Sequence, residues 1–319
     1  MNEKALKTLE YSKIIQILEN FATSSCGKDL CRNLTPLDNL SEIEIMQQET
    51  ADALARIYQK GSLSFGGVKD IRGSLKRLEI GSTLGTGELL SLCSLLENTN
   101  RAKAYSRREN AEEKQDSLDD MFEILQPLTP LALEIRRCIL SEEEIADDAS
   151  AGLKQIRRTM KNTNDKIHNQ LSSYVSGSAR TYLQDAVVTM RNGRYCIPVK
   201  AEHKGQVPGM IHDQSSTGST VFVEPMAIVK LNNDLRELEI KEQAEIEIIL
   251  SNLSQYAAEN LEAIEDDLKV MTQLDFIFAR ALLAKAQNAT EPRFNTKGII
   301  DLKKARHPLI DKHKVVPID

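Results

Sequence analysis

The stretch from residue 187 to residue 223 constrains the fold most, because a β-rich passage there interrupts two long helical patterns. Asn192-Gly193 separates two short apolar runs, and both residues tolerate the positive φ that a two-residue hairpin turn requires. A second pair of strands is predicted at residues 209–212 and 220–223, around a run rich in Ser, Thr and Gly that favours turns. The sequence therefore predicts a small sheet between helices.

Composition narrows the fold class and the kind of partner. The 319 residues are enough for two or three domains, and 4% aromatic residues with no Trp suit Leu- and Ile-seamed helices better than a sandwich or barrel. A net charge of -6 argues against a protein that coats nucleic acid over its whole surface. Any contact with a polyanion must therefore be confined to a local basic patch.

The cysteine pattern and the lack of long apolar runs indicate a cytoplasmic protein. The five cysteines are scattered without a C-x-x-C pair, so we expect reduced, buried thiols rather than disulfides or a zinc site. No stretch resembles a signal peptide, and no run approaches the roughly 20 apolar residues that span a bilayer. No membrane partner is expected.

Apolar periodicity predicts helices on both sides of the sheet. Short helices are predicted over the first 100 residues or so, and one long helix is predicted from Leu153 to about Gly177. A second pattern continues from Ile228 to about Gln287 without Gly or Pro, which predicts one unbroken helix. An antiparallel hairpin within the chain fits better than a coiled-coil dimerisation rod, which stays open as the alternative. Residues 298–302 read as a strand.

The predicted sheet is the basic part of an acidic chain. Residues 180 to 210 contain five Lys or Arg against two acidic residues. Arg191 and Arg194 flank the turn, where extended cations can contact a phosphate backbone without reading sequence. The alternative is a solvated hairpin whose charges protect strand edges. A basic stripe on the first long helix permits the same two interpretations, duplex contact or surface salt bridges, and consists of Lys154, Arg157, Arg158 and Lys161.

Catalytic and metal sites are not favoured. His212, Asp213 and Ser215 have the residue types of a nucleophilic triad, but they lie too close in sequence for their side chains to converge in line. The glutamates between residues 237 and 247 read as a solvated helix face rather than a metal site. The glycines between residues 61 and 87 match no phosphate-binding motif and read as turns. We predict no catalytic residue and no metal ligand.

Several ordered segments carry a family resemblance, namely residues 71–72, 80–81, 189–202, 212–220, 223–225, 231–233, 305–308 and 315–317. Together they closely resemble the bacterial type-two MutS paralogues, the Smr-type MutS family, over essentially the whole chain. The resemblance implies a mainly α fold, in which a helical core domain carries a long antiparallel pair of lever helices with a small inserted β clamp.

The resemblance also implies a division of the chain. It places the helical core domain at residues 1–130, the first lever helix region at 131–180, the β clamp at 181–227, the second lever helix at 228–290, and the start of a truncated ABC-type ATPase domain at 291–319. The clamp residues expected to contact DNA are Arg191, Asn192, Arg194, Lys200, His203 and Lys204.

ATP and Mg are cofactors expected of the full-length protein rather than of this chain. In the family a Walker A loop follows this region, and a Smr nuclease domain lies further on, so we expect no enzymatic turnover from this chain alone. Val315 and Val316 fall where the family lines its adenine site. Ile318 stands where mismatch-repair relatives carry Asn, which departs from the family's nucleotide pocket.

The function implied by the resemblance is a DNA-binding part of a MutS-family ATPase. Two copies in a homodimer would grip branched or recombining DNA through sequence-independent backbone contacts and limit homologous recombination. The alternative is recognition of stalled or collided ribosomes, with ribosomal RNA as the ligand, and a third reading is a dimerisation scaffold. DNA and ribosomal RNA both present phosphate, so the sequence does not choose between them.

Overall fold

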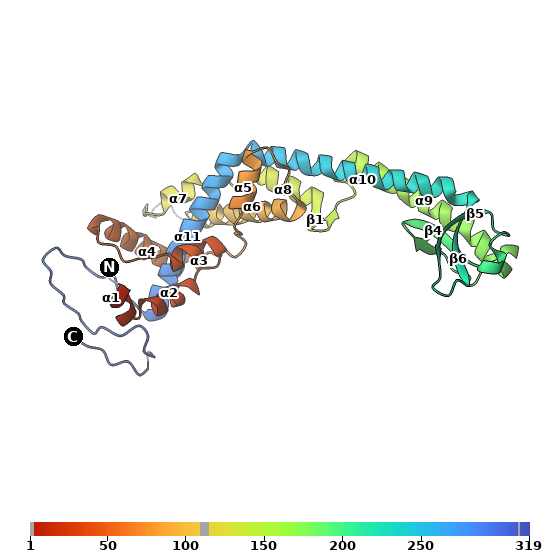
Figure 1. Cartoon of the computed structure of the whole chain (residues 1–319). Helices are drawn as coiled ribbons and strands as arrows, with labels where there is room; N and C mark the ends of the chain where they lie inside the picture. The colour runs from red at the N-terminus through yellow and green to blue at the C-terminus, as the bar shows by residue number, and fades with distance from the viewer. Residues whose placement is uncertain (1–2, 109–114, 312) are drawn as a thin grey trace. The chain divides into compact units, whose positions relative to one another are not determined.

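The computed structural model describes residues 3–108, 115–311 and 313–319. Contacts divide the chain into two compact units, which we call unit 1 (residues 1–136 and 253–319) and unit 2 (residues 137–252). The described part of the chain is mostly helical and contains one two-stranded and one four-stranded sheet (Figure 1). The mainly α class predicted from the sequence is what the structure has.

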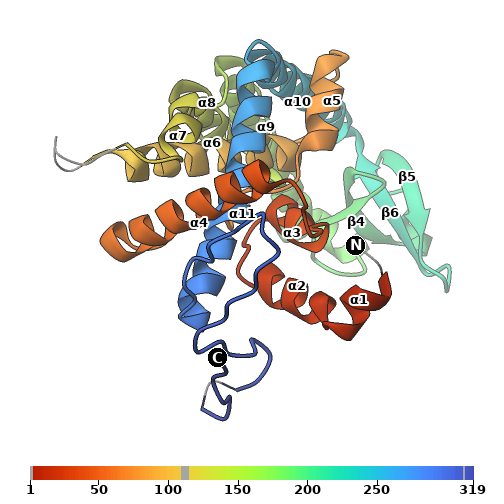
Figure 2. The same ribbon diagram turned by 90° about the vertical axis from the view of Figure 1, so that its left-hand side faces the viewer.

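Unit 1 is built around one helix. Its elements are α1 (Glu3–Thr8), α2 (Tyr11–Glu19), α3 (Ser25–Arg32), α4 (Leu40–Lys60), α5 (Arg72–Glu79), α6 (Thr86–Ser106), α7 (Asp119–Ile124), most of α8 (Thr129–Cys138) and α11 (Leu261–Gln287). The last of these, α11, contacts each of α2 to α7, and Figure 2 shows it in blue at the centre of these helices. On α11, the ring of Phe278 packs edge-on against Phe65 at 5.7 Å and Tyr105 at 5.9 Å.

A buried carboxylate ties the start of α3 to α11. Asp275 is 1% exposed and accepts the backbone N–H groups of Thr23 at 3.1 Å and Ser24 at 2.7 Å. These are donors that precede a helix and would otherwise be unsatisfied in the interior. Gly27 lies so close that an added Cβ would stand 2.2 Å from Asp275 Oδ2, so only glycine fits there.

Two antiparallel helices and a sheet make up most of unit 2. Helix α9 (Ala151–Ser176) starts where the Ser150 hydroxyl accepts the Leu153 N–H at 2.9 Å, and α10 (Met226–Ala258) runs beside it (Figure 1). Arg157 pairs with Glu242 at 2.7 Å, and further along the pair Ser150 donates to Glu245 at 2.7 Å. Residue numbers therefore rise on one helix as they fall on the other. The antiparallel pairing is as predicted.

The four strands of the larger sheet are β3 (Thr189–Arg191), β4 (Arg194–Lys200), β5 (Gly209–Gln214) and β6 (Thr220–Pro225). They are antiparallel in the order β3-β4-β6-β5, while β1 (Ile139–Ser141) pairs with β2 (Glu144–Ile145) in a separate small sheet. Asn192 and Gly193 have φ of 50° and 73°, so the predicted hairpin turn is confirmed.

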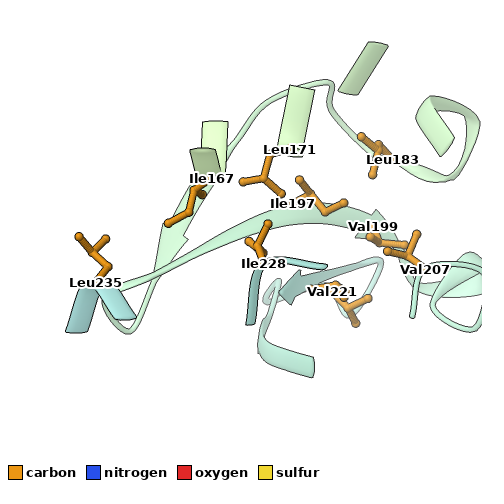
Figure 3. Close-up of a cluster of buried hydrophobic side chains, with 10 residues drawn as sticks. Ile167, Leu171, Leu183, Ile197, Val199, Val207, Val221, Ile228 and Leu235 are labelled. Atoms are coloured by element: carbon orange, nitrogen blue, oxygen red, sulfur yellow. The ribbon is translucent and has the colours of Figure 1, made fainter. Parts of the chain in front are cut away.

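One apolar cluster joins this sheet to both helices of unit 2. Figure 3 shows Ile197 and Val199 of β4 and Val221 of β6 beside residues of the two helices. The helix residues of the cluster are Ile167 and Leu171 of α9 and Ile228 and Leu235 of α10. Because the inward side chains of alternating strand positions all enter this cluster, the sheet and the helix pair share a single core.

Two sequence predictions are wrong in detail. The predicted unbroken helix after Ile228 is two helices, because α10 ends at Ala258 and α11 starts at Leu261. Asn260 at the break donates its side-chain amide to the Tyr256 carbonyl, a local bond by which Asn competes with the helix ladder. The predicted strand at residues 298–302 is absent, since the described tail pairs only at the isolated bridge Ala305–Ile318 and a strand needs a neighbour.

The cysteines are free and buried, as predicted, and they are Cys26, Cys31, Cys93, Cys138 and Cys196. Burial raises the pKa of Cys93 and of Cys196 to about 11, which keeps both thiols protonated. Within the described residues we find no helix long and apolar enough to cross a membrane.

A carboxyl in unit 1 makes stability depend on pH. Asp267 is fully buried, and its Oδ1 accepts the Gln126 N–H at 2.8 Å while Oδ2 has no partner among the described residues. Burial raises the pKa of Asp267 to about 7, with the charge of Asp266 adding to the rise and Lys103 opposing it.

Replacing Asp267 by Asn should therefore stabilise the chain at alkaline pH. The folded state holds the proton more tightly than the unfolded chain, so stability falls as pH rises from about 4 to about 7 and then levels off. At about 1.4 kcal/mol per pKa unit, Asp267→Asn should recover a few kcal/mol at pH 8 and clearly less at pH 5. Melting temperatures at both pH values measure this, and an equal effect at both would contradict it.

Candidate nucleic-acid interface

The hairpin turn places its cations over the sheet rather than out into solvent. The guanidinium of Arg191 lies 3.8 Å from the ring centroid of Phe222, and its Nε is 3.2 Å from a carboxylate oxygen of Asp213. The side-chain amide of Asn192 donates to the His212 carbonyl at 3.4 Å. The turn between β3 and β4 is thus fastened to β5 and β6, and Arg191 is about one-third exposed.

Arg194 belongs to a buried ionic network. It donates to Glu224 at 2.7 Å and also to the side chain of Asn233. Glu224 is fully buried, and its other oxygen bonds to the ring of His212. A buried carboxylate requires such partners because its desolvation costs several kcal/mol. Arg194 therefore holds β4 and β6 to α10 while keeping part of its side chain at the surface.

Asn232 of α10 completes the backbone ladder of β4. Beyond the pair Ile197–Val223, Tyr195 would face Pro225, which has no N–H to donate. The Asn232 side chain takes this place, accepting the Tyr195 N–H and donating to the Tyr195 carbonyl, each at 3.2 Å. It also donates to Glu224 at 2.7 Å, which joins this ladder to the ionic network.

The opposite end of β4 carries a second group of basic residues, which we call the sheet-end cluster: Arg180, Lys200, His203 and Lys204. The Gln184 N–H donates to the Pro198 carbonyl at 2.9 Å, and Leu183 bridges Val199, so the segment that contains Arg180 lies beside this end. Lys200 donates to the Thr181 carbonyl at 3.3 Å.

An aromatic side chain and a hydroxyl-rich turn border the sheet-end cluster. The ring of His203 packs against Tyr182 with centroids 5.4 Å apart, while Lys204 is exposed. The Ala201 N–H donates to the Ser219 carbonyl at 2.9 Å, which brings the turn at residues 215–219 to the same end. Cations and hydroxyl groups therefore gather at one end of the sheet.

The structure separates the six predicted DNA-contacting residues into two groups, which lie at opposite ends of the seven-residue strand β4. Arg191, Asn192 and Arg194 make contacts within the sheet, whereas Lys200, His203 and Lys204 lie in the sheet-end cluster. Arg180 joins this second group. It belongs to the basic region of residues 180 to 210, but the sequence predicts no DNA contact for it. DNA contact by any of the six stays a prediction.

The residue that sequence reasoning missed is Glu224. The signal was present, since Glu224 follows the apolar run Val221-Phe222-Val223 and directly precedes Pro225. His212 also has a different role from the one weighed in the triad interpretation, because its ring bonds to Glu224. Motif segments around residues 194, 212, 224 and 232 are thus brought together in one network.

Val315 and Val316 lie in the segment after α11. Val316 is 77% exposed, and the Val315 N–H donates to the Asp311 carbonyl at 2.9 Å. Two aliphatic side chains can form an apolar wall against a base, but they supply no group for phosphates or Mg. Nucleotide contact at these residues stays a prediction.

Comparison with known proteins relates the chain to the MutS2 proteins. No family model matches the chain. Over its full length the chain is 56% identical to the endonuclease MutS2 of Agathobacter rectalis and 57% identical to that of Lachnoclostridium phytofermentans, covering 40% and 41% of those proteins. It is 43% identical over its full length to the endonuclease MutS2 of Clostridium tetani. The chain is a homologue of the MutS2 proteins. The resemblance predicted from the sequence is confirmed.

The match to MutS2 covers all of this chain but only part of each relative. The chain spans about 40% of the length of the curated MutS2 proteins that it matches. The described residues that make the ionic network and the sheet-end cluster all lie within the aligned region, because the alignments include the full chain.

Arg194 should matter more for stability of this MutS2 homologue than Arg191. Arg194→Met leaves buried Glu224 short of its cation, which should cost about 3 kcal/mol, while Arg191→Met removes a surface cation–π contact worth about 1 kcal/mol or less. Amide hydrogen exchange in β4 and β6 measures both. Equal protection in the two variants would contradict the network described above.

Proposed function

We propose that unit 2 binds the phosphate backbone of nucleic acid, with branched or recombining DNA as its main ligand. The observation that carries the proposal is the sheet-end cluster, in which Arg180, Lys200 and Lys204 form no ion pair with any residue that the structure describes. Cations held at a surface without carboxylate partners are free to neutralise phosphates.

The chemistry of the cluster fits backbone contact rather than base reading. Lys and Arg at a sheet end contact phosphates as point charges, and the hydroxyl groups at residues 215–219 are further donors to phosphate oxygens. No described element here presents a helix for insertion into a major groove with bidentate groups for bases. Binding should accordingly be independent of sequence and sensitive to salt.

In this proposal the sheet of unit 2 is the clamp and the pair α9 and α10 are the lever helices of a MutS-type arm. The shared apolar core would transmit a movement of the helices to the sheet, and two copies in a homodimer would close on DNA as the full-length protein binds ATP. Limiting homologous recombination would follow from holding branched DNA. The relatives' name includes endonuclease, and we propose that this chain contributes DNA engagement rather than cleavage.

Removing two sheet-end cations should weaken binding of junction DNA and flatten its dependence on salt. Arg180→Gln with Lys204→Gln removes two exposed charges without disturbing the ionic network around Glu224. The slope of log K against log salt should fall in magnitude by about 2, since each phosphate contact contributes about 0.9. Fluorescence anisotropy between low and moderate salt measures this slope.

A matched control removes the same charge from unit 1. Lys69 and Lys76 are both exposed, and Lys69→Gln with Lys76→Gln should leave the slope unchanged. If both double variants lower the salt slope equally, the effect comes from net charge alone and the proposal is wrong. Repeating the sheet-end variant with ribosomes separates the ligands, because unchanged ribosome association alongside lost DNA binding supports DNA.

A further inference from the structure

Three exposed cations lie along one side of α9. Lys154, Arg158 and Lys161 follow one another at spacings of four and three, which places them on one side of the helix, and all three are exposed. The opposite side is apolar and enters the core of unit 2 through Ile167 and Leu171. The whole helix has five Lys or Arg against a single carboxylate.

These three cations have no ion-pair partner among the described residues, in contrast to their neighbour Arg157. Arg157 turns toward α10, where it pairs with Glu242 at 2.7 Å and with Asp147 at 2.6 Å. Like charges three or four positions apart destabilise a helix by roughly 0.2–0.5 kcal/mol per pair. The isolated helix thus carries a small penalty that a bound polyanion would remove.

The exposed charges of α10 are arranged differently. Lys241 pairs with Glu237 at 2.6 Å, and Arg236 pairs with Glu239 at 2.8 Å, so two of the three Lys or Arg of this helix are paired within it. The same arrangement leaves α10 with few free carboxylates for the α9 face of a second copy. The positive face of α9 is complementary in charge to a phosphate backbone.

The three cations lie in the first half of α9. Lys154 and Lys161 are about 11 Å apart along the helix axis at 1.5 Å per residue, within a helix of 26 residues. Arg180 of the sheet-end cluster lies in the short 3-10 segment Ser178–Tyr182, which follows the end of α9. A duplex lying along α9 would run toward the sheet-end cluster.

We propose that Lys154, Arg158 and Lys161 form a second phosphate-contacting surface, the α9 basic face, which extends nucleic-acid binding along the helix. This proposal rests on the proposed function and deepens it, because it defines a ligand long enough to contact the helix face as well as the end of the sheet. The occupant is duplex DNA, which the face contacts through the phosphodiester backbone.

Neutralising the α9 basic face should lower both the affinity and the salt dependence of duplex binding. The variant is Lys154→Gln, Arg158→Gln and Lys161→Gln in the full chain, and the salt slope should fall in magnitude by about 3 at about 0.9 per contact. Its melting temperature at low salt should be unchanged or slightly higher, because Gln is a good helix former and the repulsion is gone.

The matched control carries the same charge change on the other helix. Lys230→Gln, Arg236→Gln and Lys241→Gln removes three exposed cations of α10 and should leave the slope as in the unmodified chain. A DNA duplex and an RNA duplex of equal length form the two ligand arms. If the α9 variant loses affinity for the DNA duplex alone, DNA is the source of the phosphates. If it loses affinity for both duplexes, the surface accepts either nucleic acid.

Three results would overturn the inference. If the α9 variant keeps the salt slope of the unmodified chain while the sheet-end variant binds more weakly, the α9 basic face does not contact the duplex. The proposed function would stay intact in that case. Equal effects of the α9 and α10 variants would reduce the finding to net charge. Self-association that the α9 variant loses while its duplex binding is unchanged would assign the face to a second copy. Absence of duplex binding by the unmodified chain at any salt would instead end the proposed function.

Discussion

The four-stranded sheet of unit 2 depends on one buried carboxylate. Glu224 lies on β6, receives hydrogen bonds from Arg194 of β4 and from Asn232 of α10, and bonds to His212 of β5. Because an unpaired buried charge is far costlier than a paired one, these partners are held together as a set. The apolar cluster beneath the sheet supplies the burial, and Glu224 specifies which strands and which helix meet.

This network divides the basic residues of unit 2 by role. Cations near the Asn192-Gly193 turn are occupied by Glu224, Asp213 and the ring of Phe222, so they act mainly within the protein. Arg180, Lys200 and Lys204 at the other end of β4 form no ion pair with any residue that the structure describes, and the same holds for Lys154, Arg158 and Lys161 of α9. Formal charge counted along a sequence therefore overstates the charge that a ligand meets, because internal pairing uses part of it.

Local sequence signals predicted the elements whose causes are local. The hairpin follows from two adjacent residues that accept positive φ, and α9 follows from an apolar period between the cap at Ser150 and Gly177. The break at Asn260 and the missing strand at residues 298–302 were not predicted. A side-chain bond at the first and the lack of a pairing neighbour at the second depend on where other backbone groups lie.

The sequence by itself determined the resemblance to MutS2 proteins, the mainly helical class and the place of the sheet, because periodicity, turn chemistry and motif order are properties of neighbouring residues. Only the tertiary structure decided which charges are available. Arg191 and Arg194 differ from Lys204 not in residue chemistry or in distance from a turn, but in whether a carboxylate from another strand reaches them. That pairing is set by strand order and register, which join residues as far apart as 194 and 224 and which composition does not encode.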